Sequence, residues 1–168
     1  LFEDILKWKE VELGSLISKD FLEFVERYVP EDFDFLGNYL KKIVLPLSSA
    51  HGDFHPENIL IDKNQLYFID WSRYSGRSSR HFDLYDYYIF SKKDKEESWI
   101  MAWQKEFDRV DDEVLGIKTK KDYLLAYGIW KAAEDLRVLN IRGKLDKFKV
   151  KKYINFIKII KELNIVIQ

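Results

Sequence analysis

Three oxygen-bearing side chains stand at a spacing that could build one small polar site: Asp53, Asn58 and Asp70. The first two lie within the segment HGDFHPEN, and Asp70 follows the apolar run LYFI. Carboxylate and amide oxygens suit Mg²⁺, which commonly completes its coordination with water and with the phosphates of a substrate. These residues therefore predict a site for a magnesium ion and a phosphate-bearing ligand.

A β-hairpin is predicted to bring these side chains together. Two short apolar runs, each with the β-branched and aromatic residues typical of a buried strand, flank a polar segment of hairpin-loop length. If Asp62 pairs with Leu66 across a three-residue loop, Asn58 falls opposite Asp70 at the open end. Asp53 shortly precedes Asn58 in a proline-containing loop, so it is expected to fold back over the same end.

The segment HGDFHPENIL followed by YFIDW resembles the aminoglycoside phosphotransferase and choline kinase family of small-molecule kinases, whose fold is similar to that of protein kinases. Kinases use this spacing for a catalytic base and two metal ligands. The resemblance implies that Asp53 is the base that orients the acceptor hydroxyl. It implies that Asn58 and Asp70 bind Mg²⁺ and ATP, that His55 contacts phosphate, and that His51 is a buried brace of the loop.

The predicted fold class is α+β and mostly helical: the C-terminal lobe of a protein-kinase-like fold, with a small β-hairpin that carries the catalytic site. A chain of 168 residues, 46% of them hydrophobic, can bury one core, so residues 1–168 are expected to be a single domain. Neither a glycine-rich phosphate loop nor a strand with an ATP-pairing lysine is recognisable. We expect an N-terminal nucleotide-binding lobe of the same parent protein to supply them, and expect this lobe alone to be nearly inactive.

Bulk properties narrow the list of partners. The formal net charge of −1 favours neither nucleic acid nor an anionic membrane. The absence of cysteine fits a reducing compartment, and neither a signal peptide nor an apolar run of bilayer-spanning length is found. We therefore expect a cytoplasmic protein whose partners are a nucleotide and a small hydroxyl substrate.

Apolar periodicity predicts helices before and after the hairpin. The expected helices cover residues 2–14, 18–29 and 31–45, then begin near Asp83, Trp99 and Thr119, with a last one after Gly143. Asp83 is predicted to be an N-cap. The polar segment with Arg73, Arg77 and Arg80 is expected to be a surface loop. Tyr127 and Trp130 are expected to pack in the core rather than to line a substrate pocket.

Two alternatives to a kinase remain open. A metal-dependent phosphohydrolase could use His51, Asp53 and His55, because alternate residues of a strand share one face, with His81 and Asp83 nearby. The proline at position 56 would interrupt such a strand. A non-catalytic pseudokinase lobe is the second alternative, and its sign would be the loss of a site residue, although all three are present.

Two features favour a small acceptor, such as an aminoglycoside or an amino-alcohol, over a protein substrate. Gly52 stands where protein kinases have an arginine that reads a phosphorylated activation segment. Only twelve residues separate Asp70 from Asp83, too few for a regulated activation loop with a peptide platform.

Overall fold

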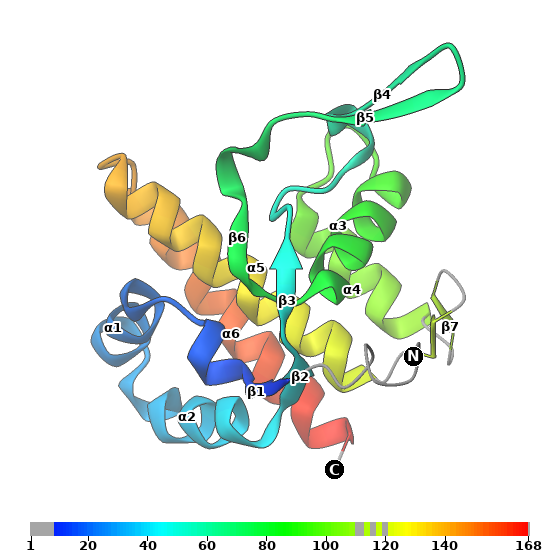
Figure 1. Ribbon diagram of the computed structural model, residues 1–168. Helices are drawn as coiled ribbons and strands as arrows, with labels where there is room; N and C mark the ends of the chain where they lie inside the picture. Colours follow the sequence, from blue (N-terminus) through cyan, green and yellow to red (C-terminus); the bar gives the residue numbers. More distant parts are fainter. Residues whose placement is uncertain (1–8, 110–112, 115–116, 119–120, 168) are drawn as a thin grey trace. The chain divides into compact units, whose positions relative to one another are not determined.

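The computed structural model describes residues 9–109, 113–114, 117–118 and 121–167 (Figure 1). The described residues divide into two compact units. The site unit comprises residues 9–11 and 45–118, and the helical unit comprises residues 12–44 and 121–167. The expectation of a single domain over residues 1–168 stays a prediction.

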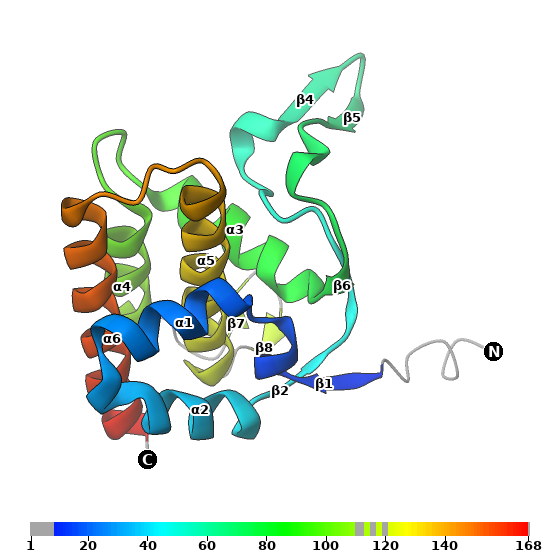
Figure 2. The ribbon, with the colours of Figure 1, turned by 90° about the vertical axis from the view of Figure 1, so that its left-hand side faces the viewer.

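The helical unit is built on helices that bury aromatic and aliphatic side chains. Its helices are α1 (Lys19–Tyr28), α2 (Phe33–Lys42), α5 (Lys121–Ile141) and α6 (Lys147–Ile167), with the 3-10 turns η1 (Leu13–Leu16) and η2 (Pro30–Asp32). Figure 2 shows α5 and α6 side by side. Phe21, Tyr127 and Phe156 are fully buried, and Trp130 is also buried, so Tyr127 and Trp130 of α5 belong to the core as predicted.

Two predicted helices of this region are wrong at their ends. Residues 1–8 lie outside the described part of the chain, but β1 (Glu10–Glu12) is a strand where a helix was expected. The helix predicted over 31–45 is shorter, because α2 ends at Lys42 and β2 (Val44–Pro46) pairs with β1. Pro46 restricts Leu45 to extended backbone, and the strand pairing of β2 continues this conformation back to Val44.

The site unit combines short strand pairs with two helices. Its elements are β3 (Ser48–Ala50), η3 (Pro56–Asn58), β4 (Ile59–Asp62), β5 (Gln65–Phe68), η4 (Trp71–Arg73), β6 (Ser75–Ser78), α3 (Arg80–Lys92), α4 (Trp99–Arg109), β7 (Glu113–Val114) and β8 (Ile117–Lys118). Antiparallel pairs form between β3 and β6, β4 and β5, and β7 and β8. Helix α3 packs against α4, and Phe82, Ile89 and Trp103 of these two helices are buried.

The observed architecture confirms the predicted α+β, mostly helical class. The segment predicted as a plain surface loop after Trp71 is partly a strand, since β6 pairs with β3 and so ties the residues after the hairpin to those before it. Within the described ranges, every helix is too short or too polar to cross a lipid bilayer.

Candidate active site

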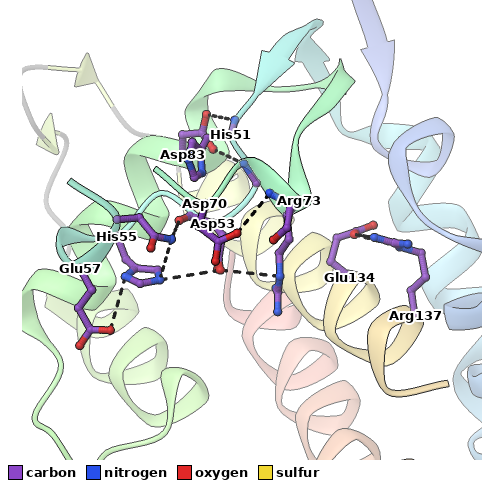
Figure 3. A network of polar contacts seen from close by, with 12 residues as sticks. His51, Asp53, His55, Glu57, Asp70, Arg73, Asp83, Glu134 and Arg137 are labelled. Atoms are coloured by element: carbon purple, nitrogen blue, oxygen red, sulfur yellow. Dashed lines mark hydrogen bonds and ion pairs between the residues drawn. The ribbon is translucent and has the colours of Figure 1, made fainter. Parts of the chain in front are cut away.

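The loop after β3 is fastened to helix α3 by a carboxylate. Asp83, in the first turn of α3, accepts hydrogen bonds from the backbone N–H groups of His51 (2.7 Å) and Gly52 (2.9 Å) (Figure 3). Gly52 has φ +83°, and a Cβ at this position would lie 2.3 Å from the carbonyl oxygen of Arg73. Only glycine fits so close an approach. Backbone contacts therefore fix the chain immediately before Asp53.

The prediction that Asp83 caps a helix is wrong. Helix α3 begins at Arg80 with Ser79 at the cap position, and the Asp83 carboxylate is used by the loop. A carboxylate near a helix start can accept from its own helix or from a neighbouring segment, and only tertiary packing decides between them. Burial raises the pKa of Asp83, although its two backbone hydrogen bonds act in the opposite direction.

Asp53 lies between two basic side chains. Its Oδ2 is 3.8 Å from Nε of Arg73 and 3.8 Å from Nε2 of His55 (Figure 3). The Asp53 side chain is 21% exposed, so a small molecule can reach it from solvent. A carboxylate in such a position can accept a hydrogen bond from a hydroxyl group and orient it.

Asn58 ties the loop together through its side-chain amide. Its Nδ2 donates to the backbone carbonyl of Asp53 (2.9 Å) and to Nε2 of His55 (3.2 Å). Arg73, whose guanidinium group is always charged, is the permanent cation beside Asp53. Both Nδ2 donors of Asn58 are then used, which leaves Oδ1 as the atom that can meet a cation.

The hairpin that follows has a different register from the predicted one. Asp62 pairs with Gln65, not with Leu66, and the turn has two residues, Lys63 and Asn64, with φ of 44° and 65°. Positive φ at both turn residues is typical of a type I′ turn, whose twist matches that of paired strands. The predicted register is therefore wrong by one residue.

This register places Ile69 rather than Asp70 opposite Asn58. The N–H of Ile69 donates to the carbonyl of Asn58 (3.0 Å), and Asp70 is the next residue. Asp70 has φ +55° and accepts a hydrogen bond from the N–H of Ser72 (3.3 Å). Hydrogen bonding from Ser72 lowers the pKa of Asp70, and the charge of Arg73 adds to the effect. Arg73 is thus within electrostatic reach of both carboxylates.

The two histidines of the loop are held by protein partners. His51 is 3% exposed, and its Nε2 donates to the carbonyl of Ile69 (2.9 Å) while its ring packs against Trp71. His55 stacks on Phe90 with ring centroids 5.3 Å apart. His51 is therefore a buried brace between the loop and the hairpin, whereas the predicted phosphate contact of His55 stays a prediction.

The phosphohydrolase alternative finds no support in this geometry. Its ligand set requires His51, Asp53 and His55 to face one ion. The described residues contain no group of three His, Asp or Glu side chains that could hold a metal ion together. The one ring nitrogen of His51 with a hydrogen-bond partner is turned toward a backbone carbonyl instead.

A family model described as "Phosphotransferase enzyme family" matches residues 9–116, which is more than half of the 168-residue chain. The chain belongs to this phosphotransferase family. No curated protein and no solved structure gives a significant match. The family resemblance inferred from HGDFHPENIL is therefore confirmed, and the mostly helical α+β architecture agrees with a kinase-like lobe.

Three residues of this phosphotransferase have site roles that the sequence pattern did not reveal: Gly52, Arg73 and Asp83. Gly52 drew notice only as a difference from protein kinases, and Arg73 only as one of several arginines in a polar segment. The available signal for Gly52 was its place beside Asp53, where a tight turn needs positive φ. The partnerships of Arg73 and Asp83 join distant parts of the chain, so no local pattern announces them.

Proposed function

We propose that this phosphotransferase transfers the γ-phosphoryl group of ATP to a hydroxyl group of a small acceptor, such as an aminoglycoside or an amino-alcohol, in a Mg²⁺-dependent reaction. The observation that carries the proposal is the double attachment of Asn58. Its side chain holds the backbone of Asp53, and its own carbonyl holds the residue before Asp70. One rigid junction thus carries the proposed base and both proposed metal ligands.

Asn58 and Asp70 are the residues proposed to hold Mg²⁺. The fit rests on their donor atoms: the Asn58 amide oxygen is left over once Nδ2 is bonded, and the Asp70 carboxylate is exposed and ionised. When bound, Mg²⁺ would neutralise charge on the nucleotide phosphates.

Asp53 is proposed to accept the proton of the acceptor hydroxyl. As it does so, the hydroxyl oxygen forms a bond to the γ-phosphorus, and the bond between the γ-phosphorus and the bridging oxygen of ADP breaks. Arg73 beside it keeps the carboxylate in place and supplies positive charge near the transferred group. Because phosphoryl transfer depends mostly on positioning and charge, these fixed contacts are the main contribution of the protein.

The proposal extends to the acceptor, to a second lobe that shares the nucleotide, and to the cell compartment. The short connection between Asp70 and Asp83 leaves no room for a peptide platform, which supports a small acceptor. ATP would be shared with an N-terminal nucleotide-binding lobe of the same parent protein. A cytoplasmic location would give the reaction its supply of ATP and Mg²⁺.

The test is Asp53→Asn in the complete natural protein that carries these residues, assayed for ADP release with a panel of amino-alcohols and aminoglycosides. Loss of a general base should lower kcat by roughly 10²–10⁴-fold. Asp62→Asn is the matched control, since it changes an exposed carboxylate on the hairpin that follows the loop of Asp53. Undiminished turnover in Asp53→Asn would remove Asp53 from its role, and no turnover by the unaltered protein with any acceptor would favour the pseudokinase alternative.

A further inference from the structure

The turn between α5 and α6 concentrates positive charge in a chain whose net charge is −1. We call residues 141–152 the basic turn. Its single acidic residue is Asp146, and its basic residues are Arg142, Lys144, Lys147, Lys149, Lys151 and Lys152. The net charge of the chain conceals this local excess, and a partner is attracted by the local charge it meets.

Most of these charges are not neutralised within the described residues. Lys149 pairs with Asp146 (2.8 Å), whereas Arg142, Lys144, Lys147 and Lys151 are exposed and have no acidic partner there. The first turn of α6 contains no acidic residue. Positive side chains near a helix N-terminus oppose the helix dipole, so this arrangement does not stabilise the helix.

Two large apolar side chains stand among the lysines. Phe148 is 80% exposed, more than any other large apolar side chain of the described residues, and Ile141 is 70% exposed. Both would gain by leaving water, because transfer of apolar surface out of water is favourable. An exposed aromatic ring and an exposed aliphatic side chain in a basic segment match a surface that inserts shallowly into a charged interface.

The backbone of the basic turn is well fixed. Gly143, at φ +60°, donates to the carbonyl of Asn140 (3.0 Å), and Lys144 N–H donates to the carbonyl of Leu139 (2.9 Å). The Asp146 carboxylate caps α6 by accepting from the N–H of Lys149 (2.9 Å). Figure 2 shows the turn at one end of the helical unit, with α2 at the other. The exposed apolar groups are therefore presented on a preorganised tip.

We propose that the basic turn is a docking surface for an anionic phospholipid membrane, with Phe148 and Ile141 entering the headgroup layer and the lysines meeting lipid phosphates and carboxylates. Lysine rather than arginine predominates, which suits diffuse attraction to a charged surface more than bidentate recognition of single phosphates in nucleic acid. Ile141 cannot stack on a base, whereas its aliphatic side chain can enter the headgroup layer of a membrane. This proposal is independent of the proposed reaction.

The test is co-sedimentation of the complete natural protein with phosphatidylcholine vesicles that contain about 30% phosphatidylserine, an anionic lipid of the cytoplasmic leaflet. We expect binding at low salt that weakens as salt rises, and no binding to pure phosphatidylcholine vesicles. Lys144→Gln/Lys147→Gln should weaken binding roughly 25-fold, about fivefold for each lysine. Phe148→Ser should weaken it by roughly threefold or more.

Matched controls separate the basic turn from general charge and hydrophobicity. Lys41→Gln/Lys42→Gln removes the same charge from exposed positions on α2, and Met101→Ser removes an exposed apolar side chain from α4; both should bind like the unaltered protein. Equal losses in the variants and the controls, equal binding to neutral vesicles, or no binding to anionic vesicles would each overturn the proposal. Binding to single-stranded RNA that depends on Lys144 and Lys147, without vesicle binding, would assign the surface to nucleic acid instead.

Discussion

The two units hold their important side chains by different forces. In the helical unit, Phe21, Tyr127 and Phe156 are fully buried, and apolar packing sets their positions. In the site unit, apolar side chains of the hairpin are largely exposed, with Ile61 at 74% and Leu66 at 60%, and polar bonds hold the loop. Apolar packing divides the stabilisation of a side-chain position among many contacts. In the loop, by contrast, each hydrogen bond is the only one of its kind that holds its part of the backbone. Small backbone changes should therefore matter more in the site unit.

The largest effect on stability is expected in the helical unit. Phe21→Ala removes a fully buried ring, and the free energy of unfolding should fall by about 3–5 kcal/mol. Leu22→Ala, at a half-buried position of the same helix, should cost less. Urea denaturation measures both, and the KM for ATP of the folded Phe21→Ala protein should stay unchanged. A large change in KM would show that the helical core also shapes the site.

Alanine at two glycines should act in opposite directions in the two units. Gly52→Ala forces a Cβ against the carbonyl of Arg73 and should cost about 2–3 kcal/mol of stability, with roughly 100-fold loss of activity. Gly37→Ala, inside α2 with open space around the new Cβ, should stabilise by about 0.5–1 kcal/mol. Thermal unfolding measures the change in stability of each variant, and the activity assay measures the loss of turnover in Gly52→Ala. Equal behaviour of the two variants would contradict the difference between the units.

Hydrogen bonds to a carboxylate should also contribute differently to the stability of the two units. Asp83→Asn keeps one acceptor oxygen but loses the second, so one loop N–H is left unpaired at a cost of about 1–3 kcal/mol. Asp20→Asn alters an exposed bond to Asn140 and should cost less than about 0.5 kcal/mol. Urea denaturation compares them, and hydrogen exchange at the His51 and Gly52 amides should accelerate only in Asp83→Asn. Unchanged exchange there would mean that other contacts fasten the loop.

The smallest expected effect is a difference in titration between two aspartates. Burial raises the pKa of Asp83 above 3.8, so its contribution to stability is present in acid and is lost as pH rises through the raised value. Hydrogen bonds from Lys149 lower the pKa of Asp146, so its contribution is present above 3.8 and is lost as pH falls through the lowered value. Carboxyl carbon NMR, assigned with Asp83→Asn and Asp146→Asn, should find the two midpoints on opposite sides of 3.8. A shared midpoint would contradict both assignments.

The hairpin illustrates how far local patterns reach. Two apolar runs typical of buried strands predicted both strands and their order. Their predicted burial is wrong, since Ile61 and Leu66 are exposed. The register also differed by one residue, because Lys63 and Asn64 adopt a two-residue turn. Neither residue is glycine, so the composition of the turn gave a weak signal. The helices of the second half were predicted well where apolar periodicity was long, and Gly143 ends α5 as expected.

The kind and order of the chemical groups at the site were determined by the sequence itself: Asp53, Asn58 and Asp70 around a hairpin, in a family whose members transfer phosphoryl groups. Tertiary structure alone decided that Asp83 fastens the loop, that Arg73 accompanies Asp53, and that Phe148 stays in water. The physical reason is the distance along the chain over which each interaction acts. Periodicity and turn preference act between near neighbours, whereas these contacts and exposures depend on segments brought together only after folding.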